Sequence, residues 1–206
     1  YLSAAGGIQS TKWMGSRSVN LRARLGKLVA DGDRIPLDTG VNQNRLRAGM
    51  SYPKDDQPNY ASEVTIGVLP GQHLDRFTAE NLADFWQKPY LVTSRSDRMG
   101  YRLSGPRLMP LEGADIISQG MVIGQIQVPS DGQPIVMMPD HPTTGGYKSI
   151  GTVCRADLPL LAQEQPEYTR IRFQKITEGE AIERLSIVYD RLDAIEKPQE
   201  DLWVTL

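Results

Sequence analysis

Apolar and polar residues alternate over short stretches in the second half of the chain, with turn residues about every ten positions. This pattern predicts strands in residues 64–71, 89–105, 121–138, 149–158 and 169–176. The segment 89–105 reads as two extended pieces around a polar patch, and 121–138 reads as a hairpin with Asp131-Gly132 in its turn. Many short strands separated by turns favour a β-barrel or sandwich over a parallel α/β sheet.

Two segments have the period of a helix instead. Thr78 begins the first, TAENLADFWQK, which places Leu82, Phe85 and Trp86 on one face and ends before Pro89. A capping box at residues 177–180 begins the second, which runs to about residue 196. Its apolar positions at helical spacing are Ile182, Leu185, Val188 or Tyr189, Leu192 and Ile195. The predicted fold class is therefore mainly β, with two helices.

The composition predicts three parts along the chain. Residues 1–37 contain a short strand, the pair Gly6-Gly7 and a turn at residues 31–33, and the polar residues 38–63 read as a linker. Residues 64–206 hold the remaining elements. The chain opens with Tyr1 inside an apparent strand and without an initiating Met, so either the N-terminus is processed or the chain is part of a longer protein, and we expect the second.

Charge and composition exclude several classes of function. The 23 basic and 25 acidic residues are mixed, with a net charge of −2, so we expect no nucleic-acid binding. No apolar run of membrane-spanning length and no signal-peptide pattern is present, so no membrane association is expected. The single Cys154, which reads as a small buried thiol, fits a reducing, cytoplasmic compartment. No metal-binding or nucleotide-binding motif occurs, and we expect no metal site.

Two patches on the predicted strands carry candidate binding groups. Arg98 and Arg102 lie in a polar bend, where a guanidinium can clamp a carboxylate or phosphate; the alternative is a solvated turn. Gln125 and Gln127 point to the same side of the first hairpin strand. Two neighbouring amides suit a neutral amide or lactam as well as a carboxylate. The alternative is that these glutamines simply face solvent.

The segment after the hairpin is the third candidate site. It is predicted to be a loop that combines a carboxylate, an imidazole, two hydroxyls and two glycines: Asp140, His141, Thr143, Thr144, Gly145 and Gly146. Backbone amides exposed by the glycines can hold an anion while His141 or Asp140 moves a proton. The alternative is a hairpin end with a surface histidine.

At these residues the sequence resembles the KipA family, also called allophanate hydrolase subunit 2 or the C-type subunit of prokaryotic 5-oxoprolinase. The resemblance rests on AAGGI, MGSRS, VLPG, SDRMGYRLSG, GQIQVPSDGQPIVMMPDHPTTGGY and ADLPLLAQ in that order, and it extends from Tyr1 to about Phe173. The stretch after Gly-Gly-Ile departs from the family pattern, and the tail beyond Phe173 matches nothing specific.

The resemblance implies cyclophilin-like β-barrel domains, with residues 1–37 as the remainder of an N-terminal barrel and 64–206 as a C-terminal one. It implies a hydrolase subunit of an ATP-dependent 5-oxoprolinase, inactive without its A-type and its KipI-like B-type partners, with ATP as co-substrate of the complex. One alternative is a biotin-dependent carboxyltransferase-like domain acting on urea or a related amide. Another is a non-catalytic regulator that antagonises a KipI-like histidine kinase inhibitor. In the first reading Arg98 or Arg102 takes the substrate carboxylate, and Gln125, Gln127 and His141 hold its amide.

Overall fold

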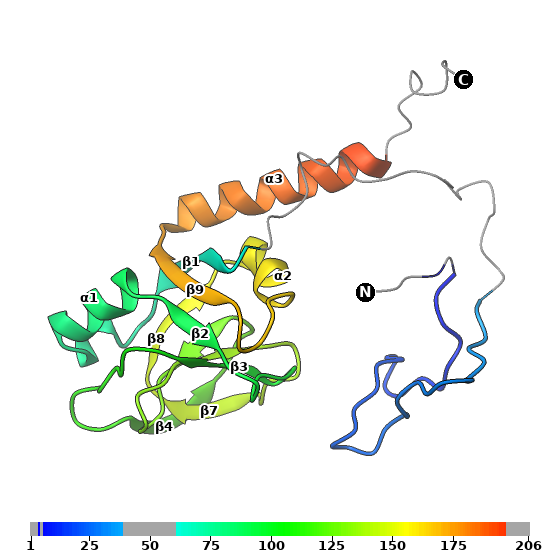
Figure 1. Cartoon of the computed structure of the whole chain (residues 1–206), viewed down its shortest axis with the longest axis horizontal. Helices are drawn as coiled ribbons and strands as arrows, with labels where there is room; N and C mark the ends of the chain where they lie inside the picture. The colour runs from blue at the N-terminus through cyan, green and yellow to red at the C-terminus, as the bar shows by residue number, and fades with distance from the viewer. Residues whose placement is uncertain (1–3, 5, 39–60, 197–206) are drawn as a thin grey trace. The chain divides into compact units, whose positions relative to one another are not determined.

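The computed structural model describes residues 4, 6–38 and 61–196. The chain divides into two compact units, Tyr1–Pro53 and Lys54–Leu206 (Figure 1). Most of the predicted linker at 38–63, and the strand expected at the first residues, lie outside the described residues. No helix in the described parts of the chain is long and apolar enough to cross a membrane.

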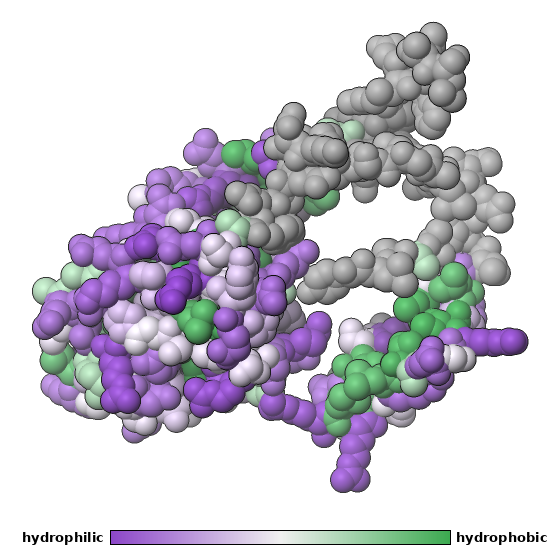
Figure 2. Space-filling model, viewed as in Figure 1, coloured by the Kyte–Doolittle hydropathy of each residue, from purple (hydrophilic) through white to green (hydrophobic). Residues whose placement is uncertain are grey.

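The first unit has little regular structure in its described residues. It contains isolated antiparallel bridges, among them Ile8 with Leu37 and Asn20 with Leu25. The predicted turn before Arg34 is confirmed, since Asp33 N donates to Ala30 O and Gly32 has a φ of 79°. Figure 2 shows green apolar surface on this unit. Its exposed large hydrophobic side chains are Ile8, Trp13, Met14, Val19, Leu21, Leu28, Val29, Ile35 and Leu37.

The second unit is built on a closed seven-stranded barrel, which confirms the mainly β fold class. In chain order its strands are β1 (Glu63–Pro70), β2 (Tyr90–Val92), β3 (Gly100–Ser104), β5 (Gln125–Gln127), β6 (Ile135–Met137), β8 (Ser149–Val153) and β9 (Arg170–Lys175). The spatial order is β1-β8-β5-β6-β3-β2-β9, and the parallel pairing of β1 with β9 closes the barrel. All other neighbouring strands are antiparallel.

A two-stranded ribbon, β4 (Asp115–Gly120) with β7 (Thr144–Tyr147), forms a separate sheet of the same unit. Figure 1 shows the ribbon at the lower edge of the barrel. The helices are α1 (Ala79–Gln87), α2 (Leu158–Leu161) and α3 (Glu178–Glu196), with short 3-10 turns η3 (Leu74–Arg76) and η4 (Arg155–Asp157). The short α2 has Pro159 in its first turn.

The core follows the alternation that the sequence predicts. Ile171 and Phe173 are buried on β9, while Arg170 on the same strand stays exposed. In α1, Phe85 stacks on Phe173 with ring centroids 4.7 Å apart. The fully buried aliphatic side chains from the other strands are Ile66, Val68, Val92, Leu103, Ile126, Val136 and Ile150.

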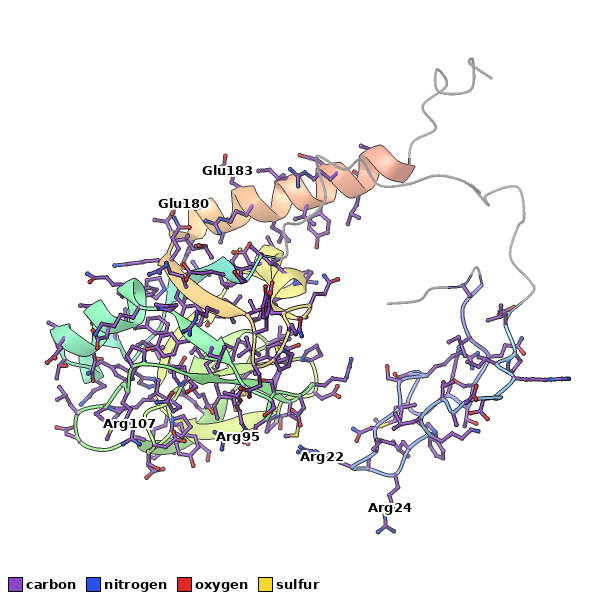
Figure 3. The ribbon with its side chains drawn as sticks, in the orientation of Figure 1. Arg22, Arg24, Arg95, Arg107, Glu180 and Glu183 are labelled. Atoms are coloured by element: carbon purple, nitrogen blue, oxygen red, sulfur yellow. The ribbon has the colours of Figure 1, made fainter. Side chains whose placement is uncertain are left out.

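The beginnings of both long helices are capped as predicted. Thr78 Oγ1 accepts from Asn81 N at the start of α1. At α3, Glu180 Oε2 accepts from Thr177 N at 2.7 Å, and Thr177 Oγ1 accepts from Glu180 N at 3.3 Å. Figure 3 shows Glu180 and Glu183 on the first part of α3, pointing away from the barrel.

The first part of α3 is fixed to the barrel. Arg184 Nη1 lies 2.8 Å from Asp157 Oδ2, which also accepts from Gly67 N of β1 at 2.7 Å. Beyond this contact the helix extends past the barrel (Figure 1), and Tyr189 and Leu192 are half exposed. The exposed stripe residues Ile182, Tyr189 and Leu192 are therefore not part of the barrel core.

Two predictions along the 121–147 segment are wrong in detail. The first hairpin strand begins at Gln125 and not near residue 121, because Gly124 has a φ of 83° and Gln125 N donates to Val122 O in a turn. The expected loop at 140–146 ends at Thr143, because residues 144–147 form β7 against β4. The Gly145-Gly146 pair therefore belongs to a strand and not to an anion-binding turn.

Two glutamates in the loop before β9 have opposite electrostatic surroundings. Glu164 is 5% exposed, and its Oε1 has no hydrogen-bond partner among the described residues. Burial raises the pKa of the Glu164 carboxyl, and a hydrogen bond from Thr169 offsets part of this rise in pKa. Exposed Glu167 accepts from Ser94 N at 2.6 Å, and this hydrogen bond lowers the pKa of its carboxyl.

We expect Glu164→Gln to stabilise the protein at neutral pH by on the order of 1 kcal/mol, because a buried carboxylate loses its charge. A raised native pKa means that the native state holds the proton longer, so wild-type stability falls as pH rises from the ordinary carboxyl range through the raised pKa. The gain of Glu164→Gln should therefore vanish at acid pH. It is measured as the unfolding free energy against pH.

Glu167→Gln is the matched control in the same loop, with the opposite sign. Because the native pKa of Glu167 is lowered, its contribution is complete above the ordinary carboxyl range and is lost as pH falls through the lowered pKa. Glu167→Gln should destabilise the protein at neutral pH and not at acid pH. The same pH dependence for both variants would contradict this assignment.

Candidate functional site

The arginine bend and the histidine loop are joined by an ion pair. Arg98 donates from Nε to Asp140 Oδ2 at 2.9 Å and from Nη2 to Asp140 Oδ1 at 3.1 Å. Asp140 N also donates to Arg98 O at 2.8 Å. The hydrogen bond from Arg98 holds the pKa of the Asp140 carboxyl below its usual range. Asp140 is thus ionised at neutral pH and suits the role of an anchor better than that of a proton carrier.

The structure fixes the tautomer of each histidine in its neutral form. His141 Nδ1 lies 2.6 Å from Pro142 O, and because a carbonyl oxygen can only accept, Nδ1 carries the proton. The Nε2 of half-buried His141 is then its basic nitrogen. His73 has the opposite tautomer, since its Nδ1 accepts from Ser149 N at 3.0 Å. Of the two, His141 belongs to the predicted site and has the nitrogen suited to accept a proton.

Gln125 and Gln127 do not face solvent, although they alternate with the core residue Ile126. Their relative exposures are only 6% and 4%. Gln125 Oε1 accepts from Val122 N at 3.3 Å. Gln127 Nε2 has long contacts, 3.5 Å to Tyr147 O and 3.7 Å to Met121 Sδ. The solvent-facing alternative is therefore wrong for both glutamines.

The β4–β7 ribbon is what buries Gln127. A Cβ placed on Gly145 would lie 2.6 Å from Gln127 Nε2 and would overlap Met121 Sδ. One face of β7 thus lies directly against the outward side of β5, at a separation that only glycine permits. Successive strand residues face opposite sides, so Thr144 and Gly146 point away from Gln127. Of these three β7 residues, Gly145 therefore contacts Gln127, and Thr144 and Gly146 face the opposite side of the ribbon.

Arg102 lies on the same outward face as Gln127. It pairs with Ile135 of β6, and Ile135 pairs with Gln127 of β5, so the three side chains form one cross-strand row. Two strand spacings place the Cα atoms of Arg102 and Gln127 roughly 10 Å apart. The Arg102 side chain is exposed, and its backbone is held by Thr93 and Ser96.

The predicted patches are therefore linked through direct contacts. Arg98 binds Asp140, Met121 N donates to Thr143 O at 3.0 Å, and Gly145 meets Gln127. Exposed Thr143 contributes this backbone carbonyl, and no side-chain role follows from the structure for Thr144 or Gly146.

Two buried polar groups of this region were not predicted from the sequence. Lys148 is 5% exposed, and its Nζ donates to Leu111 O at 2.6 Å and to Gly113 O, which ties the start of the ribbon to the barrel. Gln119 of β4 pairs with Gly145, and its Nε2 is buried. Both lie in segments without a clear hydrophobic period, so the sequence offers no signal for them. The described residues contain no group of three or more His, Cys, Asp or Glu that could hold a metal ion.

We expect Gly145→Ala to destabilise the protein by about 1–3 kcal/mol, since the added methyl overlaps Met121 and Gln127 in a packed interface. Gly120→Ala on the partner strand is the matched control, because its Cβ would meet no described atom within 4 Å. Denaturant unfolding measures both variants. Equal stability of the two would show that the ribbon does not pack on β5 as described.

Comparison with known proteins places this chain in a family. Residues 1–175 match the family model of the carboxyltransferase domain, subdomain A and B. The C-type subunit of 5-oxoprolinase from Escherichia coli is 36% identical over 167 residues, which are 79% of this chain and 52% of that protein. The protein of the same name from Haemophilus influenzae is 32% identical over 203 residues, 96% of this chain and 62% of that protein.

The crystal structure of Kluyveromyces lactis urea carboxylase has the same fold over 98% of this chain and 20% of that chain, with a TM-score of 0.79 at 24% identity. The chain spans between 52% and 62% of the length of the two curated relatives. Since the family model covers residues 1–175, the protein belongs to the carboxyltransferase domain family, subdomain A and B.

Proposed function

We propose that this chain belongs to the C-type subunit of an ATP-dependent 5-oxoprolinase, a hydrolase complex that opens 5-oxoproline to glutamate. The observation that carries the proposal is the row in which the buried amide of Gln127 and the exposed guanidinium of Arg102 share one face of the barrel. The substrate has the matching groups, a neutral lactam and a carboxylate. The names of the two curated relatives support the same assignment.

In this proposal Arg102, and not Arg98, receives the substrate carboxylate, because Arg98 is already paired in bidentate geometry with Asp140. Gln127 holds the lactam. His141 presents Nε2 as a proton acceptor, and Asp140 fixes the loop that carries His141. Gln125 supports the turn before β5 through its bond to Val122 N.

The complex would contain two further proteins, a KipI-like B-type partner and an A-type partner, with ATP as co-substrate. We place the ATP site outside the described residues of this chain, since its sequence has no phosphate-binding motif. This arrangement leads us to expect that the isolated chain is inactive.

A second candidate is a carboxyltransferase-like activity that depends on biotin and acts on urea or a related amide. The match to the carboxyltransferase family model favours it. Urea is also a small planar amide that Gln127 can bind, but it has no carboxylate for Arg102. The two candidates therefore differ in whether Arg102 contributes to substrate binding.

Reconstitution of the full-length protein with its two partners tests the proposal. We expect hydrolysis of ATP that depends on 5-oxoproline and yields glutamate, and no such activity without the partners. Avidin should not inhibit the reaction. If the complex is inactive with 5-oxoproline but transfers carboxyl groups to urea in an avidin-sensitive reaction, the second candidate is correct.

Arg102→Met should raise the KM for 5-oxoproline about 10- to 100-fold, because a charge-assisted hydrogen bond to the substrate carboxylate is lost. Arg95→Met is the matched control, an exposed arginine in the neighbouring bend (labelled in Figure 3), and it should leave KM unchanged. An unchanged KM for Arg102→Met would remove this residue from the site.

A further inference from the structure

The amide of Gln119 is an unusual feature of the ribbon. Its Nε2 is buried, yet among the described residues it has no hydrogen-bond partner. Buried polar groups in folded proteins nearly always have a partner, so an unpaired donor beside a candidate site is available to bind a ligand.

Gln119 lies on the side of the ribbon that faces the barrel. It pairs directly with Gly145, and residues paired across antiparallel strands project to the same side. The side-chain direction of Gly145 leads to Gln127 Nε2 at 2.6 Å, which identifies that side as the interface with β5. Gln119 and Gln127 therefore enter the same interface from opposite sheets.

Gln127 is itself only weakly paired. The contacts of its Nε2, 3.5 Å to a carbonyl oxygen and 3.7 Å to a thioether sulfur, are at the limit of hydrogen bonding. Two amide donors, one unpaired and one weakly paired, thus lie in one buried interface with Met121 as an apolar neighbour.

We propose that Gln119 and Gln127 jointly donate hydrogen bonds to the carbonyl oxygen of a small neutral amide, so that Gln119 is a second substrate-binding residue. The neighbouring cation, Lys148, is engaged with the carbonyls of Leu111 and Gly113, which leaves neutral donors for the ligand. Neutral donors favour a neutral carbonyl over an anion, and each Oε1 can accept from the amide N–H of the same ligand. The ligand class is lactams and ureas, and the choice of 5-oxoproline within it rests on the proposed function.

The test uses the full-length protein assembled with its two partners, and calorimetry with 5-oxoproline, 2-pyrrolidinone and urea. Gln119→Met keeps the length of the side chain but has no donor. We expect it to weaken binding of both lactams about tenfold, as expected for one lost hydrogen bond. Arg102→Met should weaken only 5-oxoproline, because 2-pyrrolidinone has the lactam and no carboxylate. Gln72→Met, at an exposed glutamine outside the ribbon, is the matched control and should change neither affinity.

A merely structural role for Gln119 predicts a different result. Removing an unpaired donor should not lower the melting temperature of the ligand-free complex, whereas removing a structural hydrogen bond should. If Gln119→Met fails to assemble, Gln119→Glu supplies the second measurement, because it replaces the donor with an acceptor and should also lose lactam binding.

The outcomes separate this inference from the proposed function. Unchanged affinity of Gln119→Met for both lactams overturns the inference while the 5-oxoprolinase proposal stands. If wild type ignores 5-oxoproline but binds urea or 2-pyrrolidinone through Gln119, the amide site stands and the proposed function fails. If wild type binds none of the three ligands, the inference is overturned.

Discussion

The close approach of β7 to β5 at Gly145 is the constraint on which the site depends. The outward face of a barrel strand is ordinarily solvated, and amides there gain little from binding a neutral ligand in competition with water. The ribbon excludes water from Gln127 because its strand lacks a side chain at the point of contact. A buried amide then has few partners, so a ligand that offers a carbonyl gains a full hydrogen bond.

The ion pair between Arg98 and Asp140 gives the loop between β6 and β7 a fixed geometry. Two parallel hydrogen bonds between a guanidinium and a carboxylate restrict both orientation and distance. The backbone bond from Asp140 N to Arg98 O adds a third restraint. These contacts therefore fix the position of the backbone at the next residue, His141. The residues that hold the loop are then distinct from the histidine suited to proton transfer.

In the second unit, apolar contacts fill the barrel interior and polar contacts lie outside it. The barrel interior is filled by aliphatic and aromatic side chains, and the stacking of Phe85 on Phe173 fixes α1 to β9. The polar contacts gather outside the barrel, where the ribbon, Lys148 and the arginine bend meet the outward strand faces. A packed interior resists deformation, which suits it to position a site on its surface. In general, one fold can carry different chemistries when the residues on its surface change.

The sequence by itself determined the elements whose signals are local. Thr177 and Glu180 cap α3, and the alternation around Ile171 and Phe173 builds β9, because each pattern needs only neighbouring residues. It also brought Arg98, Asp140, His141 and Gln127 forward as candidates on their chemistry. It left open whether Gln127 faces solvent or a ligand, because alternation distinguishes the two faces of a strand but not what covers the outer one.

Only the tertiary structure decided which candidates meet. Arg98 and Asp140 are 42 residues apart, and no local pattern encodes their pairing. The sequence predicted Gly145 to lie in a loop, because glycine is rare inside strands. The strand that pairs with it, β4, lacks an alternating apolar pattern and was not predicted either. The sequence did not identify Gln119 as a candidate. Whether its amide donor has a hydrogen-bond partner depends on the atoms that pack around it in the fold. Burial and hydrogen-bond satisfaction depend on contacts distant in sequence, and the fold alone brings those contacts together.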